Sequence, residues 1–410
     1  MKVVFITPVT PYKENMGGPS GHPYHLMIER PENIDIIIYS YNNNHLSQET
    51  ISQVEQELRV DIKLLKQPIW WLLIIRLHLT FIRLLLKYPI NCYIRLNDKT
   101  KAEIQSQKPD LIWGYGQEFN GILRQFKESR RLHTVPDCYS LHFYRRLGKK
   151  LTLSSMKEYW RVVTNYSKHY RMERDYDDSS NIVYHLVGEE DRRFLQEISP
   201  RLNSHFIRHP RYEVNKLKIE NGELKIKFHE QKIKLLIAGR YDLYMRQSAD
   251  ELIAHLNDNV NLNPNLNLLK EQYTLTFLGK GWEGHVEALR DAGWEVEHIK
   301  FAPDYIEEIT KHDIQITPIA FGTGTKGKVL DALANGLLVI GTPYAMENIA
   351  VENGVSCIEY REPKEVMDVL SDIITNREKY EAMAQAGREA VLKYHDRRLL
   401  AEELLGICNG

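Results

Sequence analysis

Short apolar runs alternate with longer helical patterns along most of the chain. In the first half, six runs bounded by turn residues predict β-strands at Val3–Thr7, Ile34–Tyr39, Asp61–Leu65, Asp110–Trp113, Leu132–Val135 and Ile182–Val187. In the second half, five runs predict strands at Lys234–Ala238, Thr274–Leu278, Val296–Lys300, Ile314–Pro318 and Leu337–Gly341. Strands that alternate with helices are typical of βα units on a mostly parallel sheet. The pattern therefore predicts an α/β fold.

A polar segment separates the two series of strands. Residues 209–231 are rich in Lys and Glu and show little core-forming periodicity. The chain has 410 residues, whereas a single hydrophobic core stops growing at roughly 250–300 residues. We therefore predict two doubly wound Rossmann-like domains, at 1–208 and 232–394, joined by a linker at 209–231. Residues 395–410 are predicted to form a C-terminal helix that can cross back to the N-terminal domain.

The segment 69–88 is mostly apolar and has no acidic residue. At 100° per residue, four of its polar side chains fall in one narrow stripe: Arg76, Thr80, Arg83 and Lys87. This pattern favours a helix that is nearly all buried. The alternative interpretation is peripheral membrane contact through 69–88, in which Trp70, Trp71 and the cationic stripe lie on an anionic membrane surface.

Charge and cysteine content narrow the class of partner. Lys and Arg total 54 against 55 for Asp and Glu, so the formal net charge is -1 and no global field favours nucleic acid. The four cysteines are far apart and form no CxxC pair, which indicates neither a zinc site nor a disulfide framework. The apolar run at the N-terminus is too short for a signal peptide. We expect a cytoplasmic protein that holds anions at a local site.

A glycine-rich segment, Phe321 to Lys328, follows the predicted strand Ile314–Pro318 and leads into a helical pattern. Glycines let the backbone approach an anion closely, and free N–H groups lie where a helix starts. On the helix, Lys328, Asp331 and Asn335 lie within one narrow arc. The segment is a candidate diphosphate cradle, and the Asp331 carboxylate suits two ribose hydroxyls. The alternative for Asp331 is a solvated helix face.

Further cations are needed to bind a nucleotide diphosphate. A helix terminus contributes roughly 0.3–2 kcal/mol, whereas a ligand bound at ~100 μM needs about 5.5 kcal/mol. Hydrogen bonds to charged groups contribute ~1.5–3 kcal/mol each. Gly239 and Arg240 follow the strand Lys234–Ala238, and Arg246 lies six residues further on. We predict that Arg240, Arg246 and Lys326 clamp the diphosphate, rather than being ordinary surface residues.

Two other phosphate or metal motifs are present in form only. Residues 322–328 satisfy GxxxxGK, but Val329 stands where a P-loop needs Ser or Thr to bind Mg²⁺. Asp175 and Asp177 form a DxD sequence within a polar run. We interpret residues 322–328 as a diphosphate cradle that is not a P-loop, and the DxD sequence as a solvated turn. We expect no metal and no cofactor.

The segment Asp313–Thr342 resembles the donor-binding domain of glycosyltransferase family 4, retaining enzymes of the GT-B fold. It reads DIQITPIAFGTGTKGKVLDALANGLLVIGT and matches that family's strand, glycine-rich loop, helix and following strand. Weaker similarities are Gly239-Arg240, the VGEED sequence at 187–191 and Gly17-Gly18. The resemblance implies two domains that face a central cleft, and a nucleotide-diphosphate sugar as the donor.

The resemblance also implies roles for single residues. Asp331 would hold the donor ribose. The backbone of Gly324 and Thr325, together with Lys326 and Lys328, would hold the diphosphate without a metal. Phe301 and Ala302 would lie against the nucleobase. Phe301 is alternatively a core residue. The family often has a glutamate eight residues before the position of Asp331, where this chain has Thr323. The identity of the donor sugar therefore does not follow from the resemblance.

The predicted function is transfer of a hexose-type sugar from a nucleotide-diphosphate sugar to a glycan or lipid-linked acceptor, in surface polysaccharide synthesis at the inner face of the cell membrane. Arg240 and Lys326 would stabilise the leaving diphosphate, Asp137 would lie near the sugar or acceptor, and Gly17 and Gly18 would line the cleft. Asp137 alternatively caps the next helix. Other readings are a nucleotide-sugar-binding protein without catalysis, or a sugar-nucleotide epimerase or phosphorylase of the same architecture.

Overall fold

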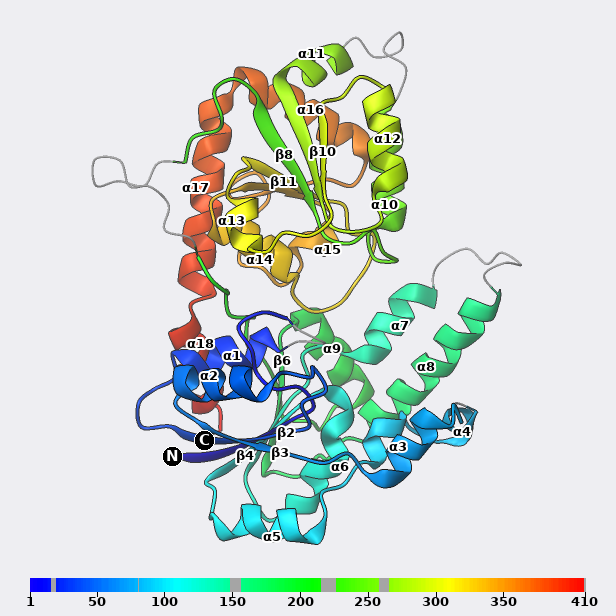
Figure 1. Ribbon diagram of the computed structural model, residues 1–410, viewed down its shortest axis with the longest axis vertical. Coiled ribbons are helices and arrows are strands. Elements are labelled where there is room, and N and C mark those ends of the chain that lie inside the picture. The colour runs from blue at the N-terminus through cyan, green and yellow to red at the C-terminus, as the bar shows by residue number, and fades with distance from the viewer. Residues whose placement is uncertain (16–19, 80, 148–155, 215–225, 258–264, 409–410) are drawn as a thin grey trace. The chain divides into compact units, whose positions relative to one another are not determined.

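A computed structural model describes residues 1–15, 20–79, 81–147, 156–214, 226–257 and 265–408 (Figure 1). The chain forms two compact units. The first contains Met1–Pro210 together with Arg397–Gly410, and the second contains Arg211–Asp396.

The first unit is built on a parallel sheet with the strand order β3-β2-β1-β4-β5-β6-β7. Its strands are β1 (Lys2–Thr7), β2 (Asp35–Ser40), β3 (Asp61–Leu64), β4 (Leu111–Tyr115), β5 (Arg131–Thr134), β6 (Ile182–Leu186) and β7 (Ser204–Phe206). The central strands β1, β4, β5 and β6 are buried over nearly their whole length. Burial on both faces explains why they appear in the sequence as continuous apolar runs.

Helices cover both faces of this sheet. They are α1 (Gly21–Ile28), α2 (Gln48–Leu58), α3 (Ile69–Arg76), α4 (Ile82–Leu85), α5 (Asp98–Ser106), α6 (Asn120–Leu123), α7 (Tyr139–Leu147), α8 (Met156–Arg174), α9 (Glu189–Ile198) and α18 (Arg397–Gly406). The last helix, α18, packs on α1, and its Leu400, Leu404 and Leu405 are buried in the same cluster as Val3 and Phe5. The C-terminal residues thus complete the core of the N-terminal unit.

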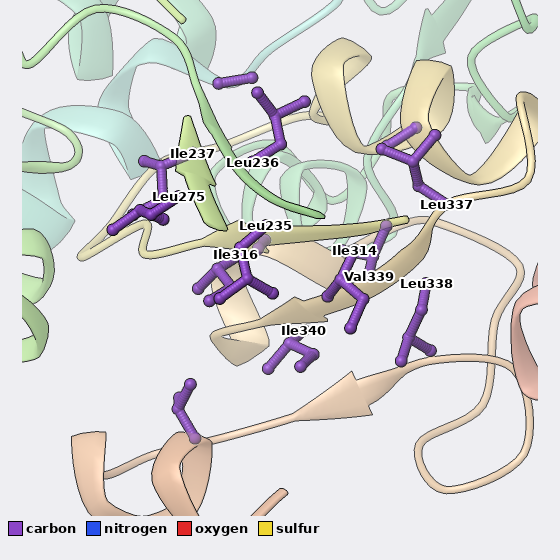
Figure 2. Packing of buried hydrophobic residues seen from close by; sticks show 14 of the residues in the cluster. Leu235, Leu236, Ile237, Leu275, Ile314, Ile316, Leu337, Leu338, Val339 and Ile340 are labelled. Atoms are coloured by element: carbon purple, nitrogen blue, oxygen red, sulfur yellow. The ribbon is translucent and has the colours of Figure 1, made fainter. Parts of the chain in front are cut away.

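The second unit has a parallel sheet with the order β10-β9-β8-β11-β12-β13. Its strands are β8 (Ile233–Ala238), β9 (Tyr273–Leu278), β10 (Val296–Ile299), β11 (Ile314–Thr317), β12 (Leu338–Gly341) and β13 (Ile358–Glu359). Its helices are α10 (Arg246–Leu256), α11 (Asn265–Gln272), α12 (Glu283–Asp291), α13 (Tyr305–Ile309), α14 (Gly327–Ala334), α15 (Pro343–Met346), α16 (Pro363–Thr375) and α17 (Arg377–Tyr394). Figure 2 shows Leu235, Ile316 and Val339 within the core cluster of this unit.

All eleven predicted strands are present, and the prediction of two doubly wound α/β domains is confirmed. The pattern missed the edge strands β7 and β13. Strand β7 has three partly buried residues, Ser204 to Phe206, and β13 has two. Segments this short carry no periodicity that would separate them from loops.

The prediction that 69–88 forms a nearly buried helix is wrong. Helix α3 ends at Arg76, His78 has a left-handed backbone (φ 51°), and a separate short helix, α4, begins at Ile82. Ile69 is 76% exposed and Leu85 is 81% exposed. Of the helices that the structure describes, none is long and apolar enough to cross a bilayer.

Part of the predicted linker 209–231 belongs to the second unit. Phe228 is buried in the core of that unit, and its N–H donates to Glu381 Oε1 at 2.9 Å. The N–H of His229 donates to Asp313 Oδ1 at 3.1 Å, beside the start of β11. The apolar residues of this segment are scattered among Lys and Glu without core-forming periodicity, so the sequence pattern could not place Phe228 in the core.

Candidate functional site

Two loops of the second unit meet at the carboxyl end of its sheet, because β8 and β11 are neighbours there. Gly239 follows β8 with a φ of +117°, and a Cβ at this position would lie 2.7 Å from Lys328 Nζ. Lys328 is on the first turn of α14, and its ammonium lies 2.9 Å from Met245 Sδ. Gly239 therefore leaves the space that the Lys328 side chain occupies.

The glycine-rich loop between β11 and α14 is held from several sides. Ala320 N–H donates to the Tyr244 carbonyl at 2.7 Å, and Thr342 Oγ1 donates to the Ile319 carbonyl at 2.6 Å. Asn348 Nδ2 donates to the Gly324 carbonyl at 2.9 Å. Gly324 itself has φ +62°, a conformation that favours glycine. These bonds hold the loop in place at the helix start.

Cations gather around the start of α14. Lys326 Nζ donates to the Thr323 carbonyl at 2.8 Å and to the Gly324 carbonyl at 3.1 Å, so this ammonium lies on the loop itself. Burial lowers the pKa of Lys328 to about 8, and the positive charge of Lys326 acts in the same direction while Asp242 opposes it. An anion bound here would relieve the repulsion between the two ammonium groups.

The two arginines differ in their surroundings. Arg240 directly follows Gly239, is exposed, and has no side-chain partner among the described residues. Arg246 is the first residue of α10, and its guanidinium lies 5.4 Å from the centroid of the Tyr241 ring. Arg240 can therefore bind an anion without losing an existing contact, whereas Arg246 would have to give up its contact with the Tyr241 ring.

Asp331 lies on the second turn of α14 and is only 9% exposed. Burial raises the pKa of this carboxyl to about 7, and no side chain or N–H of the described residues donates to it. The solvated-face interpretation is therefore wrong. Asn335, which shared the predicted polar face, caps the helix end instead, since its Nδ2 donates to the Asp331 carbonyl at 2.8 Å.

Tyr305, at the start of α13, was missed in the sequence. Its hydroxyl is buried and lacks a hydrogen-bond partner within the described part of the chain. Burial raises the pKa of Tyr305, and the negative charge of Asp331 raises it further. The Tyr305 hydroxyl and the Asp331 carboxyl are thus two buried polar groups that interact electrostatically, and neither has a hydrogen-bond partner among the described residues. A tyrosine six residues beyond the end of β10 carries no motif that could have identified it.

Phe301 and Ala302 follow β10 as predicted, but they differ in exposure. Phe301 is 75% exposed, so it is not a core residue, while Ala302 packs partly against the core cluster of the second unit. An exposed aromatic ring at the carboxyl end of a parallel strand is available for stacking on a planar ligand.

In the first unit, Asp137 follows β5 and is half-buried, and its carbonyl accepts from Gln117 Nε2 at 3.2 Å. The start of α7 is capped by Glu173 of α8, whose Oε1 accepts from Tyr139 N–H at 2.8 Å. Glu173 was missed because nothing in the sequence marks a glutamate on α8 as buried. Gly17 and Gly18 lie outside the described residues.

The DxD sequence is not a solvated turn. Asp175 Oδ2 accepts from Lys87 Nζ at 2.9 Å, and Asp177 Oδ2 accepts from the buried guanidinium of Arg131 at 2.7 Å. Tyr176 between them is buried in the core of the first unit. Across the described ranges, no group of three or more His, Cys, Asp or Glu side chains could hold a metal ion.

Comparison with known proteins adds the following. Residues 262–406 match the family described as glycosyl transferase-like. HepE of Anabaena, solved in complex with UDP, is 11% identical with a TM-score of 0.62, and all of both chains is covered. A glycosyltransferase of Rickettsia africae is 12% identical, covering 100% of this chain and 97% of that chain, with a TM-score of 0.62.

WaaG, a glycosyltransferase involved in lipopolysaccharide biosynthesis, is 12% identical, covering 98% of this chain and all of that chain, with a TM-score of 0.60. No curated protein matches the sequence. At these identities the likeness shows the fold, which is the GT-B fold of glycosyltransferases. The chain thus has the GT-B fold and resembles the glycosyl transferase-like family over residues 262–406, while membership of family 4 stays a prediction.

Proposed function

We propose that this GT-B protein is a retaining glycosyltransferase, which moves a hexose-type sugar from a nucleotide-diphosphate sugar to a glycan or lipid-linked acceptor. The observation that carries the proposal is the pairing, in one unit, of a cationic glycine-rich helix start with the unpaired carboxyl of Asp331. A diphosphate with an adjacent ribose has this complementary chemistry. HepE, which shares the fold, was solved with UDP and with UDP-glucose.

In this proposal the second unit binds the donor. The N–H groups of Gly324 and Thr325, together with Lys326 and Lys328, hold the diphosphate. Asp331 accepts from the ribose hydroxyls and Phe301 stacks on the base, with Ala302 beside it. Arg240 is the cation best placed to add to this set, because it directly follows Gly239 and has no competing partner among the described residues.

Transfer with retention breaks the bond between the anomeric carbon and the diphosphate oxygen, and forms a bond from an acceptor hydroxyl to the same face of that carbon. The acceptor proton passes to the leaving diphosphate. The protein then acts by positioning and by stabilising negative charge on the leaving group. Arg240 and Lys326 take the second role without a metal, Arg246 assists them, and Asp137 of the first unit contributes to positioning the acceptor.

A nucleotide-sugar-binding protein without catalysis is the second candidate, and Thr323 is the observation that favours it. Its position, eight residues before Asp331, carries no carboxylate to contact the sugar. Such a protein would bind the donor through the same loop but release no nucleotide.

A panel of UDP-, GDP- and other activated sugars separates the two candidates. We expect one donor to raise the melting temperature and to release its nucleotide slowly, with release reduced by Arg240→Ala and Lys326→Ala. Lys311→Ala is the matched control, because Lys311 pairs with Glu308 at the other end of β11. Tight binding with no release and no transfer would favour the binding protein. Failure of every donor to raise the melting temperature would contradict both.

A further inference from the structure

The first unit carries an exposed apolar surface along residues 69–85, here called the apolar face. Six of its large side chains are at least half exposed: Ile69, Leu73, Leu77, Phe81, Leu84 and Leu85. A contiguous segment with this many exposed large apolar groups is unusual on a monomer and marks an interaction site.

Helix α3 has an inner and an outer side. Trp71 packs against the core of the first unit, and its Nε1 donates to Asn91 Oδ1 at 2.9 Å. Ile69 and Leu73 are spaced by one turn on the opposite side of the helix and are exposed. Trp71 therefore anchors the inner side of α3 to the core, and the outer side, with Ile69 and Leu73, is held in an exposed position.

The charged side chains of residues 69–88 are all basic, and of these Lys87 is paired with Asp175. Residues 69–88 contain no Asp or Glu, and Arg76 and Arg83 are exposed with no carboxylate partner among the described residues. Exposed leucines beside unpaired arginines match the interface of an anionic bilayer, where apolar groups enter the acyl region and cations stay with the phosphates.

A cavity of about 470 Å³ lies between α4 and α8 at the edge of the apolar face. Leu84, Leu85 and Leu86 line it from one side, and Lys168 and Arg171 of α8 line it from the other. The two cations are three residues apart on one helix face, and neither pairs with a carboxylate in the described part of the chain. Burial lowers the pKa of Lys168, and the positive charge of Arg171 lowers it further. Two adjacent cations beside leucines fit a phosphate that carries acyl chains.

We propose that the apolar face docks on an anionic lipid bilayer, with its leucines in the acyl region and a lipid phosphate between Lys168 and Arg171. This inference goes beyond the proposed function and does not depend on it, since docking needs no sugar donor.

Flotation of the full chain with lipid vesicles tests the proposal. We expect binding to vesicles of phosphatidylcholine mixed with phosphatidylglycerol, and little to phosphatidylcholine alone. Because each Lys or Arg near an anionic surface is worth roughly a fivefold change in partitioning, Lys168→Gln with Arg171→Gln should weaken binding at least tenfold. Leu84→Ser with Leu85→Ser should weaken it as strongly.

Matched controls come from the same unit. Leu399 is 59% exposed on α18, and Arg193 is exposed on α9, so Leu399→Ser and Arg193→Gln should bind as the parent does. Circular dichroism and melting temperature check that each variant is folded. Failure to float with anionic vesicles, equal binding to neutral ones, or equal loss in the controls would overturn the proposal. Concentration-dependent dimerisation lost in Leu84→Ser with Leu85→Ser, without vesicle binding, would identify a second copy as the occupant and also overturn it.

Discussion

The Lys328 ammonium lies where a side chain on residue 239 would be, since a Cβ on Gly239 would approach Lys328 Nζ to 2.7 Å. This contact ties the end of β8 to the first turn of α14, the two places from which the proposed diphosphate site is built. The position of Lys328 therefore depends on the absence of a side chain on a neighbouring strand.

Gly239→Ala should lower both the melting temperature and nucleotide affinity. The left-handed φ of +117° strains alanine by ~1–3 kcal/mol, and the new methyl group must displace Lys328. Gly354→Ala separates the two effects, because Gly354 has φ +78° with no atom within 4 Å of a Cβ. We expect Gly354→Ala to lose stability but keep its affinity. Equal affinity in both variants would contradict the role of the contact.

Asp331→Asn should stabilise the ligand-free chain at pH 8. Burial raises the folded-state pKa of Asp331 to about 7, against about 4 in the unfolded chain. Between these pH values the folded state thus binds more protons than the unfolded state. The contribution of Asp331 to the free energy of unfolding therefore falls as the pH rises from about 4 to about 7. Three pKa units at about 1.4 kcal/mol each correspond to about 4 kcal/mol, so denaturation at pH 8 should show a gain of up to about 4 kcal/mol in the variant.

The same substitution should weaken nucleotide binding by about ten- to a hundredfold, because the paired acceptance from ribose is lost. At pH 4 the stabilities of Asp331→Asn and the parent should converge, which serves as an internal control. If the variant is less stable than the parent at pH 8, the Asp331 carboxyl has stabilising partners in the folded chain, which would contradict this account.

Phe301→Ala should weaken binding of a nucleotide while leaving the melting temperature unchanged. The side chain is 75% exposed, so its removal leaves no cavity, whereas stacking of an aromatic ring on a base contributes ~1–3 kcal/mol. Calorimetric titration with the best nucleotide checks this, with Leu268→Ala on α11 as an exposed apolar control. An unchanged affinity would remove Phe301 from the base site.

Glu173→Gln should destabilise the first unit without changing nucleotide affinity. Glu173 accepts from the N–H of Tyr139 and also from Ser140, and burial raises the pKa of its carboxyl although the Ser140 hydroxyl opposes this. In the variant an NH₂ group replaces one acceptor oxygen and leaves a buried donor of Tyr139 or Ser140 without its partner, which should cost ~1–3 kcal/mol in urea denaturation. A melting temperature equal to that of the parent would contradict the capping role.

Sequence patterns located the buried strands because parallel strands covered on both faces leave continuous apolar runs. The glycine-rich loop was found for the same kind of local reason, since strand, Gly322 to Gly324, and the helix start are adjacent in the chain. Partnerships across the fold left no such trace. Tyr305 with Asp331, Gly239 beside Lys328 and Glu173 at the start of α7 each join residues far apart in sequence.

Periodicity failed at residues 69–88 because it reports which side chains share a face, not what covers that face. The prediction that Arg76, Arg83 and Lys87 lie in one stripe assumed a continuous helix, but His78, with its left-handed backbone, interrupts that helix. The apolar side chains on the other side were then assigned to a core that does not cover them.

Titration of the nucleoside diphosphates and monophosphates of each base is the most direct test of the diphosphate cradle at the start of α14. We expect one base for which the diphosphate binds at least tenfold more tightly than the monophosphate, and we expect Lys326→Ala to remove most of that difference while Lys311→Ala keeps it. Equal affinity for diphosphate and monophosphate, or a ratio unchanged in Lys326→Ala, would contradict the proposed site.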